Sequence, residues 1–372
     1  MKQKIARIHP ADNVLVALTD LPACEDVILK DKSYKVVEFI PAKHKFAIDN
    51  IPEGGEIIMY GVLVGRAQSN IQAGGLLSTA NVKHAANGFS TGNNHMDWNK
   101  PDAGKWQNST FNGFHRADGS VGTANYWLVI PMVFCENRNI EVLREAISAN
   151  PAIGYTSDLL VTLGGSVILS EFPELCGVEQ NLIDRCVDKT KAERFSSLVK
   201  SYSQRAEEAG SGFYMNPSPG NIKDGLITDA IKSAGAAKKG GTSPVTDVLD
   251  YPEKVTKPGL NLLCTPGNDV ESTTAEVGSG ANIVLFTTGL GTPTGNPIVP
   301  VIKIATNTTL YRRMADIIDI NTGTIVEGDE TIEQAGERIL DYIIKVAGGE
   351  IEVSAVRHGQ DDFIPWKRGV SL

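Results

Sequence analysis

The C-terminal two thirds of this chain alternate between short apolar runs and helix-like segments, and this alternation limits the fold more than any other feature. In the clearest case the nine residues 126–134 are mostly apolar and stop abruptly at Cys135 and Glu136. Similar runs, each followed by a polar turn and a helical pattern, lie at 166–170, 261–264, 282–287 and 301–304. Buried strands that alternate with helices predict an α/β fold with a doubly wound, mostly parallel sheet.

Residues 1–92 have a different pattern, with short runs rich in Val and Ile at close spacing. Turn signals such as Asp12-Asn13 and Gly54-Gly55 separate these runs, which favours a small β domain of the barrel or clip type. Residues 93–110 are polar and include two tryptophans, so we expect a linker with anchoring aromatic side chains. The α/β domain then extends over residues 111–372.

The overall composition argues against several classes of protein. A formal charge of -9 is unsuited to general binding of nucleic acid or anionic membranes. No apolar run is long enough to span a bilayer, and the first residues lack the apolar core of a secretory signal. The five cysteines include no CxxC pair, which argues against a disulfide framework or a structural zinc site. We therefore expect a cytoplasmic protein that acts on a small molecule, with homo-oligomerisation left open.

Polar residues that follow the apolar runs are the first candidates for a functional site. In a parallel sheet the carboxyl ends of the strands meet at one edge, where Gly-rich turns present backbone N–H groups to anions. Cys135, Glu136, Glu171 and Asp269 are of types that could hold one divalent metal ion at that edge. Taken singly, each loop is better explained as a turn or a helix cap, and only their number favours a site.

A second group of candidates lies in the N-terminal part and consists of His9, Asp12, His44, Lys45 and His84. A histidine beside a lysine suits proton transfer, and a lysine also attracts carboxylates. The alternative, exposed strand ends without a role, is about equally consistent with each residue alone. The chain has no dinucleotide fingerprint, P-loop, HExxH or GxSxG motif, which argues against a nucleotide-dependent oxidoreductase.

Several segments, in order along most of the chain, resemble the altronate/galactarate dehydratase family. The matching segments include His9-Pro10-Ala11-Asp12, Lys43-His44-Lys45, Arg116-Ala117-Asp118-Gly119, Pro266-Gly267-Asn268-Asp269, Thr287-Thr288-Gly289-Leu290-Gly291-Thr292, Ile304-Ala305-Thr306-Asn307 and Trp366-Lys367-Arg368-Gly369. The resemblance implies an N-terminal SAF (β-clip) domain followed by a dehydratase domain. It also implies removal of water from a sugar acid, altronate to 2-dehydro-3-deoxygluconate, with galactarate as the alternative substrate. The resemblance also implies Fe2+ or Mn2+ as the cofactor, and a Lewis acid suits the reaction since hydroxide is a poor leaving group.

The resemblance also implies roles for individual residues. The implied catalytic residues are His9, His44 and Lys45, with a histidine as acid or base and the lysine holding the carboxylate. The implied substrate-binding residues are Asp12, Arg116, Asn268, Thr288, Gly289 and Asn307. The implied metal ligands are Cys135 and Glu136.

Two departures from the family pattern bear on activity. Many relatives carry a His-x-His pair where this chain has Ser78 and Ala80 before Asn81, and His84 follows three residues later. Relatives also have a long additional block after the segment that matches 135–146, so this chain is internally shortened near 147–150. Loss of strand–helix units should remove ligands and expose apolar edges. We therefore expect weak or no dehydratase activity, and a non-catalytic sugar-acid-binding remnant is the alternative.

Overall fold

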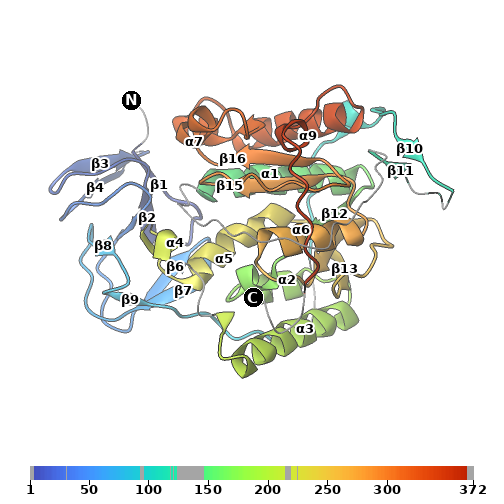
Figure 1. Ribbon diagram of the computed structural model, residues 1–372. Helices are drawn as coiled ribbons and strands as arrows, with labels where there is room; N and C mark the ends of the chain where they lie inside the picture. Colours follow the sequence, from blue (N-terminus) through green and yellow to red (C-terminus); the bar gives the residue numbers. More distant parts are fainter. Residues whose placement is uncertain are drawn as a thin grey trace.

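The computed structural model describes residues 4–30, 32–92, 96–117, 119, 121–123, 146–213, 219–223 and 225–366. Figure 1 shows a β-rich N-terminal part on one side of the molecule and a larger part of helices and parallel strands on the other. The expected order, a β-rich part followed by an α/β part, is confirmed. Among the described residues no helix is long and apolar enough to cross a membrane.

Three small antiparallel sheets build the N-terminal part. They are β1 (Ile5–Ala6), β2 (Val14–Ala17), β5 (Lys45–Ala47) and β8 (Leu76–Leu77); β3 (Asp26–Leu29) and β4 (Lys32–Lys35); and β6 (Glu56–Met59), β7 (Val62–Ala67) and β9 (Val82–Lys83). Leu15, Val36 and Phe46 are fully buried in a core shared by the first two sheets. The short apolar runs of this region therefore form a compact β core, as their pattern predicts.

The sequence pattern predicts one strand across 57–64, but the structure has two. Tyr60 and Gly61 form the turn between β6 and β7, with φ of 57° and 77°. Two consecutive residues with positive φ suit a two-residue hairpin turn, because their twist matches that of the strands. Tyrosine in the first of these places is not a turn signal, which is why the hairpin is hidden in the sequence.

Among the described residues the α/β part contains two three-stranded parallel sheets, which agrees with the expected mostly parallel α/β fold. The first has the order β12 (Ser166–Leu169), β14 (Gly259–Leu263), β13 (Val245–Leu249), and the second has β15 (Val284–Thr288), β16 (Val301–Ala305), β17 (Ile320–Asn321). Apolar runs identify buried strands but carry no information on which strands pair, since pairing depends on distant contacts. The run at 126–134 lies outside the described residues.

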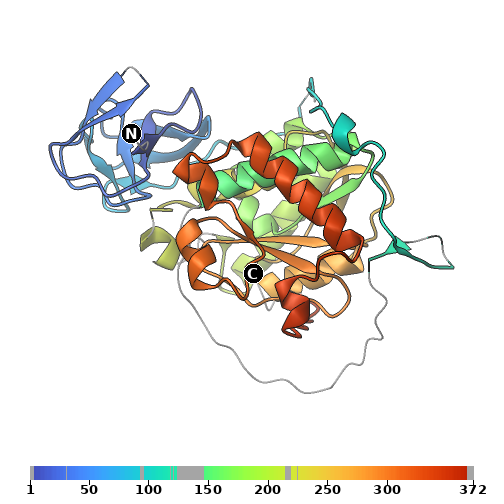
Figure 2. The ribbon, with the colours of Figure 1, turned by 90° about the horizontal axis from the view of Figure 1, so that it is seen from above.

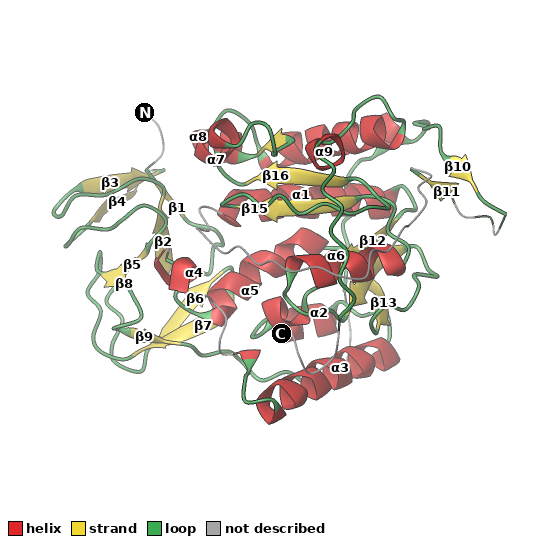
Figure 3. Cartoon of the chain, viewed as in Figure 1, coloured by secondary structure: helices red, strands yellow, loops and turns green. Residues whose placement is uncertain are grey.

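Long helices cover these sheets (Figure 3). Buried residues of α9 (Ile332–Ala347) pack in one cluster with strands β15 and β16, and those of α3 (Lys189–Glu208) pack with β13. α1 (Ala146–Thr162) lies along α9, as Figure 2 shows, and the hydroxyl of Thr156 donates to the carbonyl of Gly336 at 2.9 Å. A Cβ at Gly336 would lie 2.9 Å from the Ala152 carbonyl oxygen, so the absence of a side chain there permits the close packing.

The two parts of the molecule are joined by hydrogen bonds. The ammonium of Lys45 donates to the carbonyl of Gly225 at 2.9 Å, and the hydroxyl of Thr228 donates to the carbonyl of Val64 at 2.8 Å. Thr228 also caps α5 (Asp229–Ala237) by accepting from the N–H of Ile231. The start of α5 is therefore fixed against the N-terminal sheets.

The predicted linker contributes an aromatic anchor. Trp106, at the end of η1 (Gly104–Trp106), is 4% exposed and its indole N–H donates to Asp341 at 2.7 Å. The strands β10 (Phe114–His115) and β11 (Val121–Gly122) form a hairpin at the opposite end of the molecule from the N-terminal sheets (Figure 1). The remaining elements are η2 (Phe172–Leu175), α2 (Glu179–Asp184), α4 (Pro219–Lys223), η4 (Lys238–Gly240), α6 (Asp269–Gly278), α7 (Thr308–Arg313), α8 (Gly323–Glu327) and α10 (Ser354–Arg357).

Candidate active site

A cleft of about 1150 Å³ runs along the whole length of β12 and β15, the edge strands of the two parallel sheets, and the turn after β14 adds Gly267 and Asp269 to its wall. Three of the strand ends singled out in the sequence contribute to its wall, at 170–171, 267–269 and 287–292. A fourth, at 306–307, lies beside them, because the amide of Asn307 donates to the carbonyl of Gly289 at 3.1 Å. Parallel strands thus bring polar loops to one edge, where α/β proteins place their ligands.

Glu171 is the most unusual residue of the cleft. It follows β12 with a left-handed backbone (φ 65°, ψ 64°), which is uncommon for a residue with a side chain. The hydroxyl of Thr265 holds this conformation by accepting the N–H of Glu171 at 2.9 Å. Burial raises the pKa of Glu171 to about 8; Lys239 opposes this rise, and the carboxylates of Glu174, Asp269 and Glu276 add to it. The carboxyl group therefore carries a proton in most molecules at neutral pH.

A chain of hydroxyl groups connects the neighbouring loops. The hydroxyl of Ser170 donates to Glu276 at 2.6 Å and lies 3.0 Å from the hydroxyl of Ser272. The hydroxyl of Thr265 lies 3.1 Å from that of Ser272. These contacts link β12, β14 and α6, and they fix the wall on which Glu171 lies.

Two lysines and two further carboxylates complete the polar lining. Lys232 forms an ion pair with Glu174 at 2.8 Å. Burial is the largest effect on the pKa values of Glu171 and Asp269 and raises both of them, whereas Lys239 lowers both. Among the described residues no hydrogen-bond partner is seen for the Lys239 ammonium or the Asp269 carboxylate, so both are open to a ligand in the cleft. Glu171 and Asp269 follow predicted strands and were recognisable as candidates, whereas nothing in the sequence distinguishes Lys239.

The buried Lys303 shapes the rim of the cleft and was not singled out by the sequence. It lies on the central strand β16, is fully buried, and donates to the carbonyls of Pro293 at 3.0 Å and Thr294 at 2.8 Å. Burial lowers its pKa to about 8, and Asp319 and Asp362 oppose the change. Its contacts hold the Gly-rich loop after β15 in place.

The described residues do not form a metal site. No group of three or more His, Cys, Asp or Glu side chains is arranged to hold an ion in the part of the chain that the structure describes. The predicted ligands Cys135 and Glu136 lie outside the described residues. The carboxylates of the cleft alone therefore do not fit the predicted Fe2+ or Mn2+.

Four predicted substrate-binding residues lie at or beside the cleft, in turns and helix caps. The hydroxyl of Thr288 lines the cleft and accepts the N–H of Gly291 at 2.9 Å. Asn307 caps α7 by accepting the N–H of Leu310 at 2.7 Å, and Gly289 is held by the Asn307 amide. Asn268 caps α6, with its side chain accepting two N–H groups.

The predicted catalytic residues lie elsewhere, at the junction with the N-terminal sheets. His9 is exposed, and Asp12 is 1% exposed with its two carboxylate oxygens accepting the N–H groups of His9 and Gly61. His44 is partly buried beside Lys45, whose ammonium is bonded to Gly225. None of these four is among the residues that line the cleft, so the structure separates them from Glu171.

Arg116 is not among the residues that line the cleft, although Thr123, which follows the same hairpin, is. Arg116 follows β10 in the hairpin at the far end of the molecule (Figure 1). His84 lies near Asp229, with Nδ1 3.8 Å from a carboxylate oxygen, at the junction rather than in the cleft. The predicted set is thus divided among three regions of the structure.

Models of known protein families match two parts of the chain. A family model described as D-galactarate/altronate dehydratase, C-terminal, matches residues 144–371, and one described as the altronate/galactarate dehydratase SAF domain matches residues 3–85. The chain belongs to the altronate/galactarate dehydratase family. The resemblance inferred from the sequence motifs is therefore confirmed.

Three members of the altronate/galactarate dehydratase family illustrate the similarity. Altronate dehydratase of Bacillus subtilis (strain 168) is 28% identical over 498 residues, covering 98% of this chain and 99% of that protein. Altronate dehydratase of Escherichia coli (strain K12) is 26% identical over 495 residues, with 98% and 99% covered. Galactarate dehydratase (L-threo-forming) of Escherichia coli (strain K12) is 41% identical over 204 residues, covering 55% of this chain and 39% of that protein.

The alignment lengths also support a large internal gap relative to other family members. The alignment with the Bacillus subtilis protein has 498 positions and this chain has 372 residues, so at least 126 positions hold no residue of this chain. The predicted place of the gap, near residues 147–150, stays a prediction.

Proposed function

We propose that the chain is a hydro-lyase that removes water from a sugar acid, altronate to 2-dehydro-3-deoxygluconate, in the cleft lined by Glu171, Lys239 and Asp269. The proposal is carried by Glu171, which has a raised pKa of about 8 and a strained backbone, and by Lys239 in the same cleft, for which the described residues supply no hydrogen-bond partner. Strain and a strongly shifted pKa together are typical of functional positions. Membership of the family supports the reaction type.

Three residues of the cleft have different roles in the proposed dehydration. Lys239 binds the substrate carboxylate. It also stabilises the negative charge that develops on this group when the neighbouring carbon loses its proton. Asp269 is the base that takes this proton, because its carboxylate is open to the cleft. Glu171 donates its proton to the departing hydroxyl group, which leaves as water, and the resulting enol becomes the keto acid.

This division follows from the different environments of the two carboxyl groups. With a pKa of about 8, Glu171 is mostly protonated at neutral pH and suits the role of acid. The pKa of Asp269 is raised from a lower starting value, first by burial, while Lys239 and Lys232 lower it. The two lysines favour the ionised form of Asp269, which suits the role of base.

The metal requirement remains a proposal separate from these steps. If Fe2+ or Mn2+ is bound, Cys135 and Glu136 are the expected ligands, and the ion would supply a Lewis acid. We also keep the expectation that the internal gap reduces turnover below that of a full-length relative. A protein that binds sugar acids without turnover is the alternative.

Galactarate is the second candidate substrate. The identity to galactarate dehydratase is higher, 41%, but extends over only 204 residues, and it favours galactarate as the substrate. The similarity to altronate dehydratase extends along the whole chain and favours altronate. The two acids differ in the group at one end and in hydroxyl stereochemistry, which pocket contacts decide.

A panel of aldonic and aldaric acids, assayed anaerobically for keto-acid release with and without added Fe2+ or Mn2+, tests the proposal. We expect release from altronate by the wild-type chain and its loss in Glu171→Gln and Asp269→Asn. Exposed Glu350→Gln is the matched control. Binding of altronate with no release under any condition would favour the non-catalytic alternative. Release unaffected by both cleft variants would show that the chemistry occurs elsewhere.

A further inference from the structure

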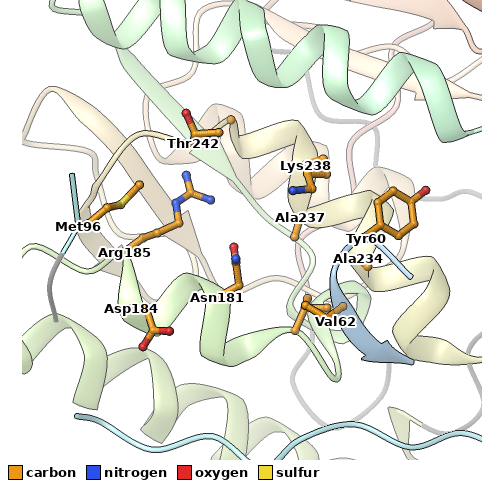
Figure 4. A pocket seen from close by; sticks show the side chains of 12 residues that line it. Tyr60, Val62, Met96, Asn181, Asp184, Arg185, Ala234, Ala237, Lys238 and Thr242 are labelled. Carbon is orange, nitrogen blue, oxygen red and sulfur yellow. The ribbon is translucent and has the colours of Figure 1, made fainter. Parts of the chain in front are cut away.

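A second, smaller cavity of about 230 Å³ lies between the N-terminal sheets and the α/β part. Tyr60 and Val62 of the β6–β7 hairpin form one wall. Residues of α2, of α5 and of the segment after it form the other, and Met96 also contributes (Figure 4). The cavity is smaller than the range of about 300–1,000 Å³ common for drug-sized ligands, so it suits a small molecule.

Arg185 is the fixed charge of this cavity. It is 7% exposed, and its Nε and Nη2 atoms donate to the carbonyl of Ser243 at 3.0 and 2.7 Å. Nη2 also donates to the carbonyl of Gly240 at 3.2 Å. Among the described residues Nη1 has no hydrogen-bond partner, and Figure 4 shows the guanidinium directed into the space that the cavity residues enclose. A buried guanidinium with an unused donor is a group that an anion would satisfy.

Lys238 supplies a second positive charge opposite Arg185. Its amine points toward the same space in Figure 4, and no hydrogen-bond partner for it is seen in the described part of the chain. The side chain is exposed overall, yet partial desolvation and the neighbouring Arg185 lower the pKa of Lys238, while the carboxylate of Asp12 opposes this change. The proximity of two cations is unfavourable unless an anion lies between them.

The remaining polar lining leaves one net positive charge. Asp184 is the one carboxylate among the lining residues; it is exposed and accepts the amide of Gln180 at 2.6 Å. Two further carboxylates affect the cations without lining the cavity, Asp158 acting on Arg185 and Asp12 on Lys238. Asp158 already accepts the N–H groups of Thr242 and Ser243 at 2.9 Å, and Asp12 accepts those of His9 and Gly61. The amide of Asn181 points into the space between the cations and offers a further hydrogen bond (Figure 4).

We propose that this cavity binds a small carboxylate anion between Arg185 and Lys238, at a site separate from the catalytic cleft. The two cavities lie on opposite sides of one segment, α5 and η4. Ala234, Ala237 and Lys238 line the small cavity, whereas Lys232, Ala236 and Lys239 line the cleft. Consecutive lysines of this segment thus serve different cavities, which is the spacing that a helical segment gives.

The adjacent lysines allow a direct test by isothermal titration calorimetry with D-glycerate as the probe and glycerol as the uncharged control. The variant Lys239→Met removes the lysine of the cleft, and we expect it to retain one glycerate-binding event. Adding Lys238→Met should weaken that event at least about tenfold, the effect of losing a charge-assisted hydrogen bond. Adding Lys254→Met, an exposed lysine elsewhere, should leave it unchanged.

A second variant guards against an effect of folding. Asn181→Asp places a negative charge at an exposed lining position, and in the Lys239→Met background it should also weaken glycerate binding. No glycerate binding in Lys239→Met, or equal binding with and without Lys238→Met, would overturn the inference. The measurement does not depend on turnover, and Lys238→Met alone should leave turnover unchanged, so failure of the proposed function would be seen separately.

Discussion

Replacement of Glu171 by glutamine keeps the size of the side chain and removes its charge, which makes it a sharp probe of the cleft. The pKa of Glu171 is raised to about 8 from an ordinary 4.5. Each pKa unit corresponds to about 1.4 kcal/mol, so the fold disfavours the ionised form by up to about 5 kcal/mol. Glutamine does not ionise and does not incur this cost.

The sign of the effect on stability follows from proton binding. Because the pKa is higher in the folded protein, folding takes up a proton between pH 4.5 and about 8. The stabilising contribution is complete below the lower value and is lost as the pH rises toward the higher one. The Glu171→Gln variant has no carboxyl group to ionise and does not lose this contribution. Its free energy of unfolding should therefore rise relative to that of wild type as the pH increases across the same window.

Urea unfolding near pH 5 and near pH 9 measures this difference. We expect the gain of Glu171→Gln over wild type to be larger at the higher pH by several kcal/mol, with about 5 kcal/mol as the upper limit. Glu350→Gln changes an exposed glutamate and should show no such trend.

Catalysis supplies the second measurement. As the general acid, Glu171 must be protonated, so kcat should fall as the pH rises through about 8. Glu171→Gln should lower kcat by about 10²–10⁴, the usual contribution of a positioned acid. A stability difference that does not change with pH, together with turnover within about threefold of wild type, would refute the reasoning.

Three further substitutions test other parts of the structure. Lys239→Met should raise KM for altronate about ten- to hundredfold through loss of a charge-assisted hydrogen bond, whereas Lys254→Met should not; equal KM values would contradict the carboxylate contact. Gly225→Ala should destabilise the protein by about 1–3 kcal/mol in urea unfolding, since φ is +84° and a Cβ would lie 2.8 Å from a carbonyl oxygen. Gly349→Ala shares a positive φ with open space around it, and an equal loss there would show that the contact is unimportant. Asn307→Ala should cost about 1–2 kcal/mol by removing a helix cap, and a change in KM with no change in stability would instead favour the predicted substrate contact.

Local patterns were sufficient for much of the cleft wall. Apolar runs followed by turns placed β12, β14, β15 and β16 to within a few residues, and parallel strands bring their ends together. Asn268 and Asn307 follow strands and precede helices, which is the position of a cap. These features depend on residues close together in the chain, so they can be inferred from the sequence.

The pairing of strands and the position of His44 and Lys45 could not be inferred in this way. The motif that contains them resembles the family, but the Lys45 side chain is bonded to Gly225, which is far away in the sequence. Likewise, apolar runs do not encode which strands pair, and only the structure shows that the described parallel strands pair into two three-stranded sheets.

The sequence by itself determined the family, the order of the β-rich and α/β parts, and which strands end in polar loops. Only the tertiary structure decided that burial raises the pKa of Glu171, that Lys239 lines the same cleft, and that Lys238 lines another cavity. The reason is physical: a pKa depends on how much water and charge surround a group, and those surroundings come from segments that are distant along the chain.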